Sequence, residues 1–155
     1  MLGQRLPPFT LQDENGEDFD SEMLSGLRWV LFFFPRAGTP GCTQESLDFS
    51  ALHAVFMSMN VPVMGVSSDS PAKLLSFKEK NSLKVKLLSD PEQKLQESLG
   101  VWGLKKSFGK EYMGTIRSTF VIGPDGRIEA EWRNLRVKGH ADAVLKRVRE
   151  LHRPA

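Results

Sequence analysis

The sequence has only one cysteine, Cys42, and this scarcity excludes several kinds of site. A single thiol cannot form an intramolecular disulfide, a Cys-x-x-Cys redox pair or a cysteine-rich zinc site. We therefore expect no metal and no cofactor, and a core held by apolar packing alone. At 155 residues the chain is long enough to bury such a core as one domain over residues 1–155. The thiol is then either inert packing or the centre of the chemistry.

The chain also lacks a strong excess of charge and a long apolar run. It carries 21 Lys and Arg against 19 Asp and Glu, a net charge of +2, and its basic residues are scattered. We therefore expect no nucleic-acid partner. Residues 1–8 contain no apolar signal segment, and no apolar run is long enough to span a membrane. We expect a cytoplasmic protein without membrane association, since a free thiol fits a reducing compartment.

Alternating strands and helices predict an α/β fold with a central mixed sheet flanked by helices. The alternation around Asn15-Gly16 predicts an N-terminal β-hairpin over residues 9–20. Further strands are expected over residues 28–34, 61–67, 85–88, 115–122 and 127–133. A short turn or helix is expected at residues 21–26, and longer helices from Cys42 to about residue 56 and over residues 70–81, 90–100 and 141–151. Residues 101–114 are glycine-punctuated and are expected to form an irregular, functional loop.

The residues around Cys42 suit a reactive sulfur. The apolar strand ends at Pro35, which has no N–H to donate to a sheet ladder. A turn rich in Gly and Pro then brings Cys42 to a helix start, where free N–H groups and the helix dipole favour a thiolate. Gly41 would let the backbone approach a small ligand closely. Thr39 either brings its hydroxyl over the helix start or only caps the helix.

Glu45 lies one turn after Cys42, and its negative charge there would disfavour a thiolate. We therefore expect an arginine from elsewhere in the chain, because a guanidinium can hold a carboxylate and still point donors at the sulfur. The alternative interpretation of Glu45 is a helix-surface residue.

The three histidines do not favour a Cys-His acyl-transfer site. His53 is eleven residues beyond Cys42 on the same predicted helix, which puts it roughly 16 Å away along the helix axis. His140 and His152 are expected to be surface or capping residues near the last helix.

The stretch Pro35-x-x-x-Thr39-x-x-Cys42 resembles the active-site motif of peroxiredoxins, in the Q type related to the bacterioferritin comigratory protein. Residues 100–103, 114–126 and 137–140 also resemble segments of that type, in the same order. The resemblance implies a thioredoxin-like fold and the reduction of hydroperoxides. It also implies that Cys42 is the peroxidatic residue and that Pro35, Thr39 and Arg117 complete the active-site set. From the arguments above, Glu45 and Gly41 are expected to support this set. The aromatic residues of the predicted loop are packing groups or substrate-pocket candidates, namely Trp102, Phe108 and Tyr112.

The chain departs from many members of this type because it has no resolving cysteine. Leu47 holds the position five residues after Cys42, and residues 71–81 contain no cysteine. We therefore expect a one-cysteine enzyme, a monomer by analogy with the Q type. Its partners would be a hydroperoxide and an external thiol such as thioredoxin, glutaredoxin or a low-molecular-weight thiol. The alternative is a peroxide-sensing redox switch or binding protein without efficient turnover.

Overall fold

The strand predicted over residues 28–34 lies at the centre of the sheet. In the computed structural model, which describes residues 1–152, it is β3 (Trp29–Phe33), and every residue in it is buried. The sheet has the order β2-β1-β5-β4-β3-β8-β9. Its other strands are β1 (Thr10–Asp13), β2 (Asp18–Asp20), β4 (Val63–Ser67), β5 (Lys86–Ser89), β8 (Ser118–Ile122) and β9 (Ile128–Arg133). β3 pairs in parallel with β4 and antiparallel with β8, which confirms the predicted mixed sheet and its N-terminal hairpin.

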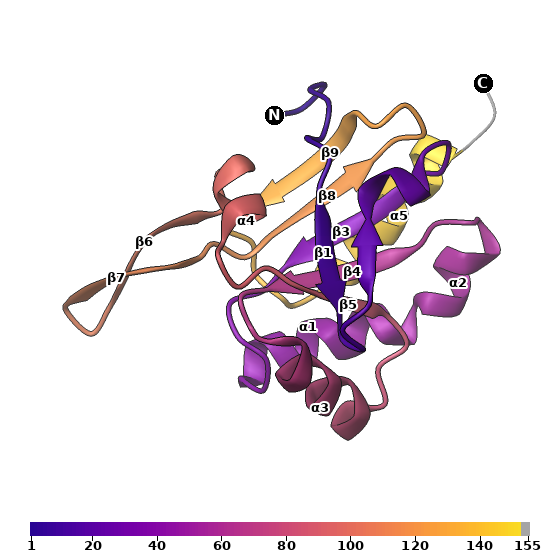
Figure 1. Ribbon diagram of the computed structural model, residues 1–155. Coiled ribbons are helices and arrows are strands. Elements are labelled where there is room, and N and C mark those ends of the chain that lie inside the picture. Colours follow the sequence, from indigo (N-terminus) through magenta and orange to yellow (C-terminus); the bar gives the residue numbers. More distant parts are fainter. Residues whose placement is uncertain (153–155) are drawn as a thin grey trace.

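Helices cover both faces of this sheet (Figure 1). They are the short η1 (Ser21–Leu24), then α1 (Pro40–Ala51), α2 (His53–Ser58), α3 (Pro71–Asn81), α4 (Lys94–Ser98) and α5 (His140–His152). None of these helices, all within residues 1–152, is both long enough and apolar enough to cross a membrane.

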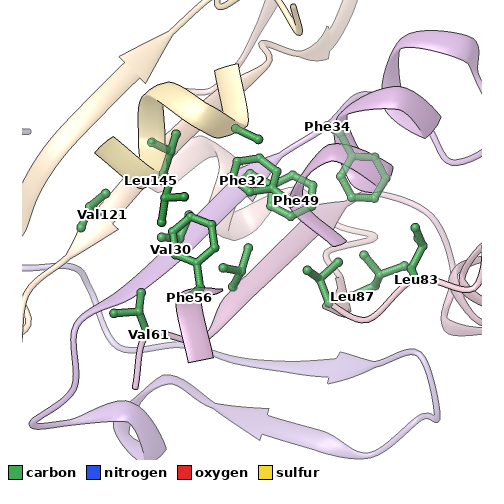
Figure 2. Close-up of a cluster of buried hydrophobic side chains, with 14 of the residues drawn as sticks. Val30, Phe32, Phe34, Phe49, Phe56, Val61, Leu83, Leu87, Val121 and Leu145 are labelled. Carbon is green, nitrogen blue, oxygen red and sulfur yellow. The ribbon is translucent and has the colours of Figure 1, made fainter. Parts of the chain in front are cut away.

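The alternation of side chains along β3 divides the core into two layers, because successive residues of a strand point to opposite faces. Val30 and Phe32 join a cluster that includes Phe49 of α1 and residues of α2, α3 and α5. Figure 2 shows this cluster, with the rings of Phe32 and Phe49 stacked at 4.6 Å between centroids. Leu31 and Phe33 face the second cluster, under the N-terminal segment and α4. The strand is therefore apolar throughout because both of its faces are covered.

Two predicted helices have different bounds in the structure. The helix expected from Cys42 to about residue 56 is divided at Leu52, which separates α1 from α2. The helix expected over residues 90–100 is shorter, because Asp90 to Gln93 form a turn and α4 begins only at Lys94. Gln93 is left-handed with φ 58°, and the Asp90 carboxylate accepts a hydrogen bond from the Gln96 N–H at 3.0 Å.

The prediction of an irregular loop over residues 101–114 was wrong. β6 (Trp102–Ser107) and β7 (Lys110–Thr115) form a two-stranded hairpin that projects from the body of the molecule (Figure 1). Its two turn residues, Phe108 and Gly109, have φ of 52° and 77°. Two positive φ values suit the twist of a tight hairpin. Phenylalanine rarely adopts such a conformation, so the sequence carries no ordinary turn signal here.

Gly65 of β4 leaves the space in which the aromatic rings of the core pack. A Cβ at this position would lie 2.6 Å from Cζ of Phe32 and 3.0 Å from Cε1 of Phe34. We predict that Gly65→Ala lowers the free energy of unfolding by about 1–3 kcal/mol in urea titrations, since both rings are fully buried and must shift.

The matched control is the same substitution in a Phe32→Leu background, which lacks the crowded ring atoms. There Gly65→Ala should cost clearly less stability. An equal cost in both backgrounds would contradict this packing account.

Candidate active site

Cys42 lies in the first turn of α1, directly beyond the carboxyl end of β3. The chain leaves β3, turns through Gly38 at φ +89° and enters the helix at Pro40. Proline suits this first helical position because its missing N–H would have no partner there. The Cys42 side chain is a free thiol with no exposed surface. The predicted placement of the thiol at a helix start is confirmed by these bounds.

Two hydrogen-bond donors converge on the sulfur. The backbone N–H of Arg36 donates to Cys42 Sγ at 3.5 Å, and Arg117 Nη2 donates to it at 3.4 Å. Arg117 Nη1 donates to Glu45 Oε1 at 2.6 Å. One guanidinium thus spans the thiol and the carboxylate, as a planar fork of donors permits. It places positive charge and directed N–H groups at the sulfur.

The backbone positions Arg117 immediately before β8. β8 pairs with β3 so that Ser118 lies opposite Phe33, which brings Arg117 level with the turn before α1. The Arg117 carbonyl accepts from the Leu135 N–H at 3.1 Å. Gly41 leaves room for the guanidinium, because a Cβ there would lie 3.2 Å from Arg117 Nη2. The absence of a side chain at Gly41 thus makes room for Arg117, and the approach of a ligand to this glycine stays a prediction.

Glu45 is buried, with only 1% of its side chain exposed, so it is not a helix-surface residue. Burial raises its pKa from 4.5 to about 7, and the positive charge of Arg117 opposes this rise. Its second oxygen, Oε2, has no hydrogen-bond partner among the described residues. The carboxyl therefore carries a net desolvation cost that the single contact with Arg117 only partly offsets.

Thr39 and Pro35 frame the turn on either side. Thr39 occupies the N-cap position of α1, yet its side chain makes no capping hydrogen bond. Its hydroxyl donates instead to the Arg36 carbonyl at 3.0 Å, across the turn. Pro35 is half-buried and precedes Arg36, whose N–H points at the sulfur. The side chain of Thr39 thus stabilises the turn rather than the helix end.

The three aromatic candidates lie along the projecting hairpin. Trp102 is half-buried at its base, Tyr112 is 47% exposed, and Phe108 is fully exposed at the tip. Phe108 therefore does not pack in the core.

A further cation lies near Arg117 that sequence patterns did not reveal. Lys105 of β6 donates from Nζ to the Thr115 carbonyl at 3.0 Å. Burial lowers its pKa, the charge of Arg117 adds to this effect, and that of Cys42 opposes it. Lys105 is brought toward Arg117 by β6, a strand of the hairpin that the sequence did not predict. No local sequence motif therefore indicated its position.

The prediction that His140 is a surface or capping residue was wrong. It is only 5% exposed, shares a 2.8 Å hydrogen bond with Thr119 Oγ1, and lies edge-on to the rings of Phe49 and Trp132. Burial lowers its pKa to about 4, with the charge of Arg117 as the second cause. The ring is therefore neutral at pH 7. The helical spacing from His140 to Val144 on the buried face of α5 was the available signal.

Within residues 1–152 no group of three or more His, Cys, Asp or Glu side chains is arranged to hold a metal ion. The chemistry that the residues around Cys42 offer is that of a thiol and the donors that contact it.

Comparison with known proteins points to one family. The AhpC/TSA family model matches residues 2–131. Peroxiredoxin Bcp of Bacillus subtilis is 43% identical over 150 residues, covering 97% of this chain and 96% of that protein. Peroxiredoxin Bcp of Escherichia coli K12 is 37% identical, covering 96% and 95%.

Solved structures agree with this likeness. A cysteine-to-serine mutant of Xylella fastidiosa PrxQ superposes with a TM-score of 0.94 at 31% identity, covering 99% of this chain and 98% of that one. A structure of Xanthomonas campestris peroxiredoxin Q gives a TM-score of 0.89 at 34% identity, covering 94% and 92%. These matches confirm the predicted thioredoxin-like fold.

Burial of Glu45 makes stability depend on pH in a defined direction. Its folded-state pKa of about 7 lies above the unfolded value of 4.5, so ionising it costs folding free energy. This cost is absent below pH 4.5 and complete above pH 7, and it is on the order of 3 kcal/mol. We predict that Glu45→Gln gains stability relative to the wild type by up to that amount between pH 5 and pH 8.

Urea unfolding of both proteins at the two pH values measures this change. Leu47→Ala, an exposed substitution on the same helix without a titratable group, should keep a constant offset from the wild type. A constant offset for Glu45→Gln as well would rule out Glu45 as the titrating group.

Proposed function

The chain belongs to the AhpC/TSA family of peroxiredoxins, in its Bcp or PrxQ type, and from this premise we propose that Cys42 is the residue that reduces hydroperoxides. Members of this family reduce peroxides at the expense of thiols. The observation that carries the assignment to Cys42 is the Arg117 guanidinium, which donates to Cys42 Sγ and to Glu45. A reactive thiolate requires such a local positive charge with directed donors.

In the first half of the proposed cycle, the Cys42 thiolate attacks one oxygen of the peroxide in line with the O–O bond. The S–O bond forms as the O–O bond breaks, and the departing oxygen takes up a proton. Cys42 becomes a sulfenic acid. Arg117 and the Arg36 N–H, which contact the sulfur before the reaction, would stabilise the charge that moves onto the departing oxygen.

Residues of the turn before α1 and of the β6–β7 hairpin would form the surroundings of the peroxide. Thr39 would shape the peroxide site because its hydroxyl holds the turn that carries the Arg36 N–H, and Pro35 would do so as the half-buried residue before Arg36. Trp102 and Tyr112 stay candidates for the wall of the substrate pocket. Phe108 is the weakest of the three because it lies in solvent.

In the second half, an external thiol must restore Cys42, because the chain holds no other sulfhydryl group. Thioredoxin, glutaredoxin and low-molecular-weight thiols all have the required chemistry. Until that thiol reacts, the sulfenic acid is open to further oxidation to the sulfinic acid. We propose that residues 1–155 act as a single domain and a monomer. The need for a thiol pool fits a reducing compartment such as the cytoplasm.

Substitution of the proposed nucleophile tests this function. We predict that Cys42→Ser loses thiol-dependent consumption of hydrogen peroxide completely, since a serine hydroxyl is not ionised near neutral pH and is a poor nucleophile. Peroxide loss is followed with excess dithiothreitol, and Leu47→Ala on the same helix should retain the wild-type rate. Equal consumption by Cys42→Ser and the wild type would sink the proposal.

The wild type without added thiol provides a second readout. It should consume about one equivalent of peroxide per chain and then stop, with mass spectrometry showing oxidation at Cys42. Continued turnover after a thiol is added distinguishes the enzyme from a peroxide sensor, which would not cycle.

A further inference from the structure

A groove of about 510 Å³ lies between the turn before α1 and the exposed side of α3. On the first side it is lined by Ala37, Gly38 and Thr43, which flank the turn that holds Cys42. Ala37 also packs against the buried cluster to which Cys42 belongs. The groove is therefore adjacent to the thiol although the sulfur itself is enclosed.

The opposite wall, on α3, carries positive charge only. Lys73 and Lys80 line the groove together with Phe77, and no Asp or Glu is among the lining residues. Within residues 1–152, neither lysine has a carboxylate within ion-pair distance. Seven residues apart on one helix, they lie two turns from each other on the same face, roughly 10 Å along the axis. Such a pair suits a ligand with two separated anionic groups.

We propose that this groove binds the reducing thiol itself, a low-molecular-weight thiol of about tripeptide size that carries two carboxylates. The inference rests on the proposed function and names the substrate class of its second half. The carboxylates would pair with Lys73 and Lys80, and the apolar part of the molecule would lie against Phe77. A concave space of this volume is in the range of small-ligand sites, whereas a protein reductant would need a much larger contact surface.

The position of the groove brings a bound thiol close to the oxidised cysteine. Cys42 Sγ is fully buried and is contacted by the Arg36 N–H and Arg117, so a thiol of tripeptide size, which is much larger than a peroxide, would reach the sulfur of the sulfenic acid only when the turn opens. The first turn of α1 has no side-chain cap from Thr39, and the hydrogen bonds across its start are those that the Thr43 N–H and hydroxyl donate to the Thr39 carbonyl, at 2.9 and 2.8 Å. Its opening would uncover the sulfur between Ala37 and Thr43, beside the occupied groove.

The chemistry balances with two molecules of thiol. The sulfur of the first attacks the sulfenic sulfur of Cys42, the S–O bond breaks, and water leaves as a mixed disulfide forms. A second thiolate attacks the outer sulfur of that mixed disulfide and releases Cys42 as the thiolate. The two small thiols are oxidised to one disulfide. The two electrons that they supply replace the two that Cys42 gave to the peroxide.

The test compares small thiols of different charge on a double variant, Lys73→Gln with Lys80→Gln. One equivalent of hydrogen peroxide first converts Cys42 to the sulfenic acid. Its return to the thiol is then timed by quenched-flow mass spectrometry with four probes at equal thiolate concentration. The probes are glutathione and mercaptosuccinate, which carry two carboxylates, neutral 2-mercaptoethanol and cationic cysteamine. Lys146→Gln, at an exposed lysine of α5, is the matched control.

We expect the double variant to react roughly fivefold more slowly with glutathione and mercaptosuccinate, the loss typical of two exposed ion pairs. Its rate with 2-mercaptoethanol should stay within about twofold of the wild type, and Lys146→Gln should match the wild type with every probe. Raising the salt concentration should shrink the difference, because exposed charges are screened.

Three outcomes would overturn the inference: no loss with the anionic thiols, an equal loss with all four probes, or efficient reduction by thioredoxin alone at the same rate in both proteins. The formation of the sulfenic acid is measured first and involves no thiol. Failure at that step would refute the proposed function, whereas failure only in the thiol series would refute the groove assignment.

Discussion

The arrangement of the site depends on the two hydrogen bonds that the Arg117 guanidinium donates, one to Cys42 and one to Glu45. Arg117 lies 75 positions after Cys42 and 72 positions after Glu45 in the sequence, so neither half of the chain can build the site alone. The antiparallel pairing of β3 with β8 brings the two segments together. Gly41 then leaves room for the guanidinium beside the helix start. The N-terminus of a helix carries only a partial positive charge, and the fold adds the full positive charge of Arg117 to it.

The same contact explains why a carboxyl is tolerated beside the thiol. Glu45 is nearly fully buried and its pKa is raised to about 7, so its burial costs stability. In return its Oε1 accepts from Arg117 Nη1, a charge-assisted hydrogen bond that helps to hold the guanidinium with Nη2 toward Cys42 Sγ. The positive charge of Arg117 also lowers the pKa values of Lys105 and His140, which burial lowers more strongly. The buried Glu45 thus lowers the stability of the fold but helps to hold the Arg117 charge beside the Cys42 sulfur.

Much of the fold follows from local sequence patterns, and the failures have identifiable causes. The buried strands are predictable because β3 and β4 are continuous apolar runs. The need for an arginine near Glu45 follows from charge alone, but its identity as Arg117 rests on the resemblance to peroxiredoxins. The β6–β7 hairpin escapes prediction because Phe108 stands at a left-handed turn position. His140 escapes because its burial depends on packing against Phe49 and Trp132, which come from other elements of the fold. The groove beside α3 arises from tertiary contacts that no motif records.

The most direct measurement of the central claim is the rate of sulfenic acid formation in Arg117→Lys. Lysine keeps the positive charge but cannot donate to Cys42 and Glu45 at once with a planar fork. Single-turnover reaction with hydrogen peroxide at neutral pH, quenched and read by mass spectrometry of Cys42, isolates this step from any thiol. The account predicts a rate constant roughly 100-fold below that of the wild type, as for the loss of one well-placed donor. A rate constant equal to that of the wild type would contradict it.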